Sequence, residues 1–215
     1  MDLHRAGRHS QWASVPARRR NAWQRLAGQT HGVITPGNVI SFIGAILVIV
    51  GLVYIYRGTL GAGLLFLLVG RLADVADGIV AARTGTKSPL GEAVDATIDK
   101  LSMLAALLVF VAAGVVPLAA IAFIALLHIV NAWLGITAKL RKRTLHPSRP
   151  GKYATALQWT AFILYVAAAV LDDSVGAGII LFLAAVSVVA SLCIGAAAVR
   201  GYAAIVLRSA AKDPA

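Results

Sequence analysis

The stretch RLADVADGIVAARTGTKSPLGEAVDATIDK, residues 71–100, decides the fold because it places acidic side chains between long apolar runs. Five of the nine acidic residues in the chain lie here: Asp74, Asp77, Glu92, Asp95 and Asp99. Residues three or four apart share one face of a helix, so the four aspartates form two pairs. The segment TGTKSP between the pairs contains glycine and proline, which are typical of a turn. The stretch therefore predicts two helices joined by a turn, which we call the aspartate hairpin.

The aspartates of the two predicted helices lie at matching heights above the turn. Asp74 lies ten residues before Thr84, and Asp99 lies ten residues after Pro89. At about 1.5 Å of rise per residue, both lie roughly 15 Å from the turn, and the inner two aspartates lie roughly 10 Å from it. We therefore expect four carboxylates to face one another in two layers.

The composition is typical of a protein with several membrane-spanning helices. Of the 215 residues, 59% are hydrophobic and 13% are charged, and the mean hydropathy is +0.81. Six apolar segments are long enough to span a hydrocarbon core about 30 Å thick. They are 38–56, 60–83, 90–113, 117–140, 153–171 and 175–207. We predict an all-α polytopic membrane protein with six transmembrane helices.

The polar ends of the chain predict one membrane domain with short flanking segments. Residues 1–34 are basic and contain two tryptophans, which predicts a cytoplasmic or interfacial segment with a surface helix over 16–29. A solvated tail is the alternative for this segment. Residues 35–208 form the predicted membrane domain, and residues 209–215 form a C-terminal tail. The start of the chain lacks the apolar centre of a cleavable signal peptide, so we expect none.

Lys and Arg concentrate on one side of the predicted helices. Of the Lys and Arg residues, Arg57 alone lies in the loops on the other side. Because cytoplasmic loops carry the excess of Lys and Arg, we expect a multi-pass protein of the cell (plasma or inner) membrane with both termini and the hairpin turn in the cytoplasm. The net charge of +11 suits anionic lipid. The chain lacks a nucleic-acid recognition module or stacking platform, so we expect a lipid bilayer as partner and no nucleic acid.

The acidic cluster is costly inside a membrane. An aspartate near the bilayer centre costs about 2.5–3.5 kcal/mol, and packed like charges add repulsion. Salt bridges of Arg71 with Asp74 and of Lys100 with Asp99 are one alternative, but two cations cannot neutralise five acids. Divalent cations can, and oxygen ligands without nearby Cys or His suit Mg²⁺, Mn²⁺ or Ca²⁺. A cation transporter is a further alternative, because intramembrane acids also line ion pathways.

The hairpin resembles the signature of the CDP-alcohol phosphatidyltransferases, D-x-x-D-G-x-x-A-R-x8-G-x3-D-x3-D. Seven positions match: Asp74, Asp77, Gly78, Ala81, Gly91, Asp95 and Asp99. One position departs, because the signature arginine falls at Ala82 and this chain has Arg83 instead. The resemblance implies a Mg²⁺- or Mn²⁺-dependent membrane phosphotransferase of phospholipid biosynthesis. It would move a phosphatidyl group from CDP-diacylglycerol to an alcohol and release CMP. Members of the family often form homodimers, so the resemblance also implies a homodimer.

Roles for individual residues follow from this resemblance. Four residues would ligate the metal, and the last of them would also be the catalytic base: Asp74, Asp77, Asp95 and Asp99. The segment TPGNVIS before the first span resembles a family segment that contacts the nucleotide. Gly78 and Gly91 leave room for close approach to the backbone, and Ser88 in the turn is a candidate hydrogen-bond donor to the diphosphate. Residues expected to bind CDP-diacylglycerol are Asn38, Ser41, Asp74, Asp77, Gly78, Ala82, Arg83, Ser88 and Gly91.

The loop after the fourth predicted helix is the most basic part of the chain, which suits an acceptor that carries a phosphate. A loop that only sets the topology is the alternative. The segment GKYATALQ, residues 151–158, resembles the G-K-x-K-T-x-x-Q stretch of phosphatidylglycerophosphate and cardiolipin synthases, with Ala154 at the second lysine. Arg143, Lys152 and Thr155 are the candidate residues for the acceptor phosphate. We expect glycerol 3-phosphate as first acceptor, then phosphatidylglycerol, then an inositol phosphate.

Overall fold

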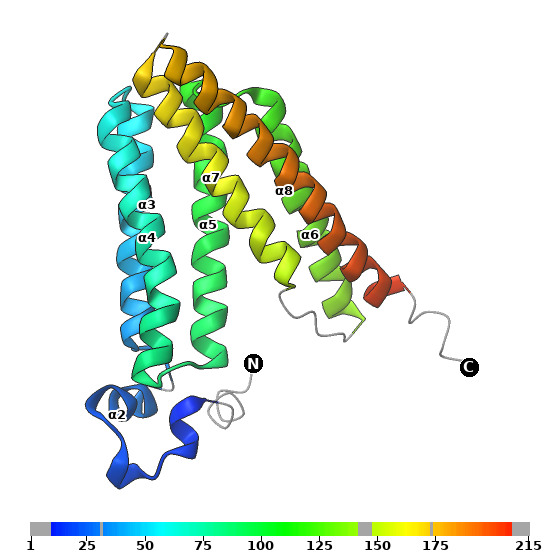
Figure 1. The fold of residues 1–215 in the computed structure, drawn as a ribbon. Helices are drawn as coiled ribbons and strands as arrows, with labels where there is room; N and C mark the ends of the chain where they lie inside the picture. Colours follow the sequence, from blue (N-terminus) through cyan, green and yellow to red (C-terminus); the bar gives the residue numbers. More distant parts are fainter. Residues whose placement is uncertain (1–9, 31, 142–147, 173, 208–215) are drawn as a thin grey trace. The chain divides into compact units, whose positions relative to one another are not determined.

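The computed structural model describes residues 10–30, 32–141, 148–172 and 174–207. All regular structure in these residues is helical, without a strand (Figure 1). Two short 3-10 helices, Gln11–Ser14 and Ala17–Arg19, come first. The α-helices are α2 (Ala22–Gln29), α3 (Pro36–Tyr56), α4 (Leu60–Thr84), α5 (Pro89–Ala113), α6 (Leu118–Leu140), α7 (Arg149–Leu171) and α8 (Val175–Leu207). The all-α prediction is confirmed.

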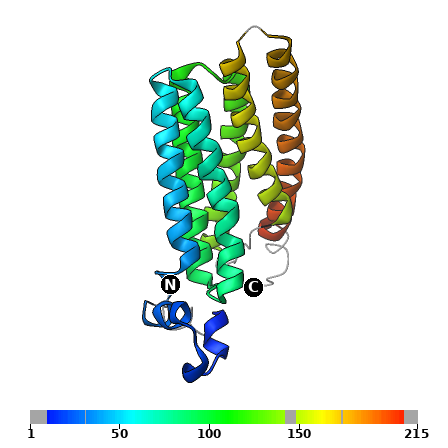
Figure 2. The same cartoon turned by 60° about the vertical axis from the view of Figure 1, so that its left-hand side comes forward.

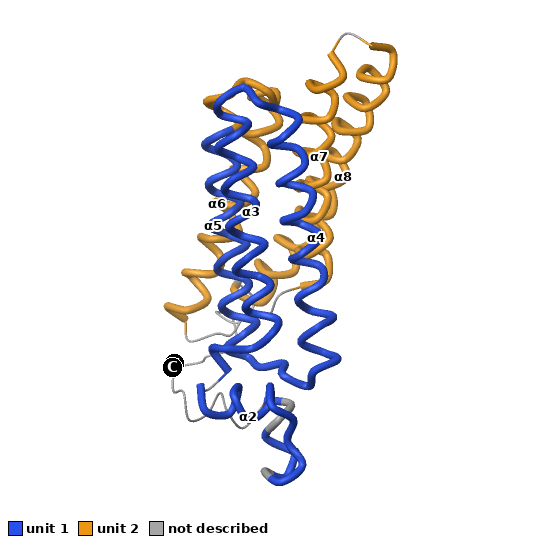
Figure 3. Tube along the Cα trace, turned by 90° about the vertical axis from the view of Figure 1, so that its left-hand side faces the viewer, with its two compact units in different colours: residues 1–109 blue, residues 110–215 orange. Residues whose placement is uncertain are grey.

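The chain divides into two compact units, residues 1–109 and 110–215 (Figure 3). The first unit contains α2, α3, α4 and most of α5, and the second contains the end of α5 together with α6, α7 and α8. The aspartate hairpin therefore lies within the first unit.

Six of the described α-helices are long, between 21 and 33 residues. Five are also apolar enough to cross a membrane: α3, α5, α6, α7 and α8. The exception is α4, in which every 18-residue stretch contains Arg71, Asp74 and Asp77. The six predicted helices are thus present with nearly the predicted bounds. Only α4 among them departs from the apolar pattern, because it carries the charged residues of the aspartate hairpin.

Large apolar side chains cover much of the outer surface. Leu72, Leu118 and Leu140 are 67%, 69% and 81% exposed. Soluble monomers rarely expose large contiguous apolar patches, whereas lipid covers such a surface in a bilayer. The outward leucines and the five apolar helices together indicate a protein of the membrane.

The surface helix predicted over residues 16–29 is shorter in the structure. α2 begins after Asn21, whose side-chain oxygen accepts a hydrogen bond from the Gln24 backbone N–H at 2.8 Å. The Gln24 side chain in turn accepts from the Asn21 backbone N–H at 3.1 Å. This reciprocal capping box starts the helix at residue 22, so the preceding residues form 3-10 turns instead. In α2, Trp23 is exposed and Ala27 is buried.

Glycines allow α3 and α4 to pack closely along their length (Figure 2). A Cβ atom on Gly44 would lie 2.9 Å from the Gly70 carbonyl oxygen, and one on Gly70 would lie 2.8 Å from the Gly44 oxygen. Gly51 and Gly63 form a second such pair, at 3.0 Å in both directions. Small residues let helix backbones approach in a bilayer. The side chains of α3 are therefore held directly against the charged half of α4.

In the second unit, α8 packs along α7 and also contacts α6. The ring of Phe162 lies 4.7 Å from that of Phe110 and meets Trp159 edge-on at 6.0 Å, as measured between centroids. Arg141 at the end of α6 donates from Nη1 to the Val206 carbonyl oxygen at 2.8 Å. The aromatic cluster joins the end of α5 to α7, and the hydrogen bond joins the end of α6 to α8.

Replacing Gly70 by alanine tests the contact between α3 and α4. The new Cβ atom would collide with the Gly44 carbonyl oxygen, so we expect Gly70→Ala to lower the free energy of unfolding by about 1–3 kcal/mol. SDS titration of the purified protein in mixed micelles measures this loss. Gly61→Ala is the matched control on the same helix, because nothing lies within 4 Å of a Cβ atom there. Equal stability of the two variants would contradict the role given to the contact.

Candidate active site

The turn of the aspartate hairpin is built by local hydrogen bonds. α4 ends at Thr84, and Gly85 follows with a φ of +66°, in the left-handed region that glycine adopts without strain. The Thr86 backbone N–H donates to the Ala81 carbonyl oxygen at 3.0 Å. Ser88 then starts α5, because its hydroxyl oxygen accepts from the Gly91 backbone N–H at 2.9 Å. These bonds set the direction in which α5 returns along α4.

Three aspartates meet between the two helices of the hairpin. Asp74 and Asp77 on α4 and Asp95 on α5 each offer a carboxylate oxygen, and these oxygens lie within 4.8 Å of one another. The Asp95 Oδ1 atom is buried and has no hydrogen-bond partner among the described residues. Buried polar atoms normally have a partner, and oxygen-only donor sets suit Mg²⁺, Mn²⁺ or Ca²⁺. This triad therefore fits a divalent cation.

A serine from α3 orients one member of the triad. The Ser41 hydroxyl lies in a short hydrogen bond with Asp77 Oδ2 and is also 3.1 Å from the Gly37 carbonyl oxygen. Ser41 is only 4% exposed and Asp77 is 7% exposed, so water competes little for this bond. The hydroxyl satisfies one oxygen of the buried carboxylate and fixes its direction.

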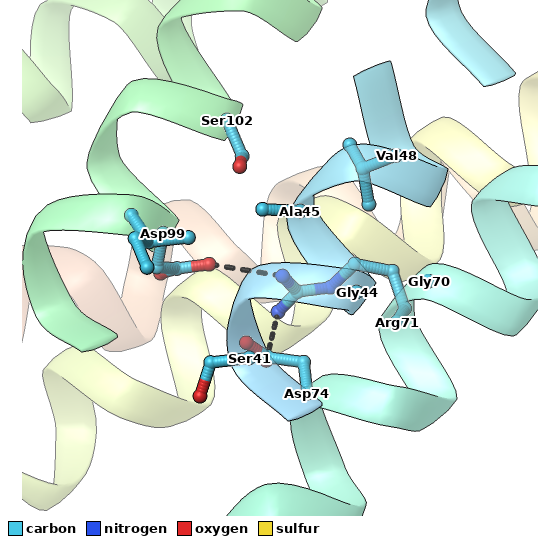
Figure 4. Close-up of a pocket in the computed structure, with 10 residues that line it drawn as sticks. Ser41, Gly44, Ala45, Val48, Gly70, Arg71, Asp74, Asp99 and Ser102 are labelled. Carbon is cyan, nitrogen blue, oxygen red and sulfur yellow. Dashed lines mark hydrogen bonds and ion pairs between the residues drawn. The ribbon is translucent and has the colours of Figure 1, made fainter. Parts of the chain in front are cut away.

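The fourth aspartate lies in an ion pair outside the triad. Arg71 Nη2 is 2.8 Å from Asp74 Oδ2, and Arg71 Nη1 is 3.0 Å from Asp99 Oδ1 (Figure 4). The sequence alternative of an Arg71–Asp74 salt bridge is therefore seen, whereas Lys100 is exposed and the partner of Asp99 is Arg71. One arginine thus connects the two helices at the height where the sequence places Asp74 opposite Asp99.

The start of α3 meets the start of α5 at a glycine. A Cβ atom on Gly91 would lie 3.0 Å from Asn38 Oδ1 and 3.1 Å from Ser88 Oγ, so a larger residue would push these groups apart. Thr35 caps α3, because the Thr35 hydroxyl accepts from the Asn38 backbone N–H at 3.1 Å. The Asn38 side chain donates to the Val33 carbonyl oxygen at 2.9 Å.

The other residues that were predicted to bind the nucleotide differ in their exposure to solvent. Gly78, Ala82 and Arg83 are exposed on α4, and nothing lies within 4 Å of a Cβ atom on Gly78. Ser88 is buried, and its oxygen caps α5. The exposed face of α4 is therefore open to a ligand, whereas the Ser88 hydroxyl is used in the hydrogen bond that caps α5.

The predicted acceptor residues belong to the second unit. Lys152 is exposed near the start of α7, and the Thr155 hydroxyl donates to the Gly151 carbonyl oxygen at 3.2 Å. Arg143 lies outside the described residues.

Sequence reasoning missed two contacts of α2 with the hairpin turn. Asn21 Nδ2 donates to the Thr84 carbonyl oxygen at 3.2 Å, and Gln24 Nε2 donates to the Gly85 carbonyl oxygen at 3.5 Å. These carbonyls lie at the end of α4, where helical partners are missing. The N-x-x-Q spacing signals the capping box, but a contact more than sixty residues away in sequence leaves no local signal.

Comparison with known proteins agrees with the geometry of the hairpin. Residues 34–207 match the family model of the CDP-alcohol phosphatidyltransferases. An uncharacterized protein of Aquifex aeolicus (strain VF5) is 38% identical over 65 residues, which cover 30% of this chain and 33% of that protein, about a third of its length. No solved structure matches the chain. Because the family model covers most of the chain and the whole aspartate hairpin, the chain belongs to the CDP-alcohol phosphatidyltransferase family.

Proposed function

We propose that the protein transfers a phosphatidyl group from CDP-diacylglycerol to an alcohol and releases CMP. Phosphatidyl transfer is the general reaction of the family. The observation that carries the proposal is the triad of Asp74, Asp77 and Asp95, whose carboxylate oxygens lie within 4.8 Å of one another. Phosphoryl transfer depends on positioned cations that offset charge on the phosphate oxygens. The family match supports this reaction over cation transport.

The triad is proposed to hold Mg²⁺ or Mn²⁺. The family depends on divalent metal in general, and the unpartnered Asp95 Oδ1 among the described residues supports a ligand role for that atom. A bound divalent ion supplies charge neutralisation at the diphosphate oxygens and at the CMP leaving group. Ser41 keeps the Asp77 carboxylate turned toward its neighbours.

The nucleotide end of the donor is proposed to lie along the exposed face of α4. Gly78 leaves the backbone accessible there. Arg83 is exposed one residue beyond Ala82, where the family signature has arginine. We assign Arg83 to the diphosphate, with Asn38 and Gly91 at the meeting point of α3 and α5. The acyl chains of the donor would remain in lipid.

Asp99 is proposed as the general base. Its carboxylate would take the proton from the acceptor hydroxyl while the hydroxyl oxygen attacks the phosphorus of the phosphatidyl group. The bond from that phosphorus to the oxygen of CMP then breaks, and CMP leaves with the bonding electron pair. The ion pair with Arg71 at 3.0 Å holds Asp99 in one orientation for this transfer.

The acceptor is proposed to be glycerol 3-phosphate. Exposed Lys152 and the partial match of residues 151–158 to phosphatidylglycerophosphate synthases support this choice, with Thr155 and Arg143 as the other acceptor residues. We assign the protein to the cell membrane with both termini and the site facing the cytoplasm, because Lys and Arg concentrate in the loops on that side.

An acceptor panel tests this function. Purified protein is mixed with labelled CDP-diacylglycerol and with glycerol 3-phosphate, phosphatidylglycerol or an inositol phosphate. We expect CMP release and labelled phosphatidylglycerophosphate with glycerol 3-phosphate, because its phosphate can pair with the basic residues. Faster product formation with either other acceptor would assign the enzyme to that branch of the family. No CMP with any of the three would contradict the proposal.

Removal of the metal is expected to stop the reaction. A chelator should abolish CMP release, because the carboxylate triad alone cannot offset the charge of the diphosphate. Added Mg²⁺ or Mn²⁺ should restore activity. Asp77→Asn should need a higher Mg²⁺ concentration for half-maximal rate, because it removes one charged ligand. Full activity in the presence of chelator would show that the triad has another role.

Replacement of the proposed base should separate turnover from donor binding. Asp99→Asn is expected to lower kcat by about 10²-fold or more, because general base catalysis contributes on that scale, while the KM for CDP-diacylglycerol changes little. Arg83→Ala is the contrasting variant, in which we expect a higher donor KM with a smaller change in kcat. Steady-state kinetics at saturating acceptor distinguish the two. An unchanged kcat in Asp99→Asn would exclude it as the base.

A further inference from the structure

Arg71 is a partly buried cation within the acidic cluster. Its side chain is 18% exposed, and the two carboxylates that it contacts are 26% and 27% exposed. Figure 4 shows the guanidinium group between Asp74 on α4 and Asp99 on α5. Two different nitrogens of the guanidinium contact the two carboxylates: Nη2 lies 2.8 Å from Asp74 Oδ2, and Nη1 lies 3.0 Å from Asp99 Oδ1. The arginine is therefore shared between two helices and is not a surface ion pair.

An arginine at this place supplies a permanent positive charge. Arginine does not lose its proton in proteins, and its planar group has donors in fixed directions. Of its two partners, Asp74 also belongs to the triad, whereas Asp99 does not. The cluster thus has two positions for positive charge: the triad, and the gap between Asp74 and Asp99 that the guanidinium fills.

The space beside the guanidinium is small. Arg71, Asp74, Asp99, Ser41 and Ser102 line a cavity of about 10 Å³, which is room for about one water molecule. Mg²⁺ needs six oxygen ligands in near-octahedral geometry and usually keeps several waters. A hydrated divalent ion therefore does not fit between Asp74 and Asp99 while Arg71 occupies this position.

We propose that Arg71 takes the place of a second divalent cation, so that the site holds one metal ion at Asp74, Asp77 and Asp95. The inference rests on the proposed function, because it assumes that the triad binds metal. One divalent ion and one guanidinium together offset three of the four carboxylate charges. The proton that Asp99 takes from the acceptor hydroxyl neutralises the fourth. Asp99 is then a base held by an arginine and not a metal ligand.

The number of bound Mn²⁺ ions tests this inference without reference to activity. The full chain in detergent is titrated with Mn²⁺, and electron paramagnetic resonance counts the bound ions and reports whether two of them are magnetically coupled. We expect one isolated ion per chain in the wild type. Arg71→Gln should bind a second ion that is coupled to the first, because the gap between Asp74 and Asp99 is then vacated. Arg71→Lys should still bind one, because it keeps the positive charge.

Three further variants make the result specific. Arg71→Gln combined with Asp99→Asn should return to one ion, because the second ion has lost a carboxylate ligand. Asp99→Asn alone should also bind one ion, since Asp99 is not a ligand in the wild type. Arg57→Gln is the matched control, an exposed arginine at the end of α3 whose loss should leave the count at one. If Arg71→Gln does not fold, the number of Mn²⁺ ions bound by the wild type and by Asp99→Asn tests the inference: more than one ion in the wild type, or a loss of the ion in Asp99→Asn, would contradict it.

Two coupled ions in the wild type would overturn the inference and leave the proposed function standing. The same holds for a single ion in folded Arg71→Gln. An absence of any Mn²⁺ binding in the wild type would instead overturn the metal site, and with it the inference. The outcomes of the titration therefore separate the two proposals.

Discussion

Repulsion among four carboxylates is the constraint that the first unit has to satisfy. The apolar helices around them screen charge weakly, so each carboxylate needs a specific partner. Arg71 pairs with Asp74 and Asp99, and the Ser41 hydroxyl pairs with Asp77. A buried Asp95 oxygen still has no partner among the described residues. Arg71 and Ser41 do not neutralise the three carboxylates of the triad. A divalent cation bound there would offset the remaining negative charge.

The close approach of α3 and α4 makes one of these partners available. Ser41 can reach Asp77 only because Gly37, Gly44 and Gly70 allow the two backbones to touch on either side of it. The turn that orients α5 depends similarly on Gly85 and on the contacts that Asn21 and Gln24 of α2 make with its carbonyls. The glycines thus position the charged groups, although they have no side chains of their own.

This arrangement suits a substrate that is partly lipid. The proposed donor, CDP-diacylglycerol, combines a charged diphosphate with two acyl chains, so its binding needs positive charge within an apolar surface. The hairpin places Arg71, and the triad that is proposed to hold a metal ion, on helices whose outer residues, such as Leu72 and Leu101, are exposed. A resident arginine beside the proposed base would also keep that base separate from the metal ligands, which divides binding from proton transfer within one cluster.

The sequence alone determined the helices, their bounds to within a few residues and the gathering of the four aspartates, because apolar periodicity, helix rise and motif spacing are local properties. Only the tertiary structure decided which cation and which hydroxyl each carboxylate meets. Arg71 is three residues from Asp74, but its bond to Asp99 spans 28 positions, and Ser41 lies 36 positions from Asp77. Such pairings depend on how closely helices pack and on the direction of each side chain.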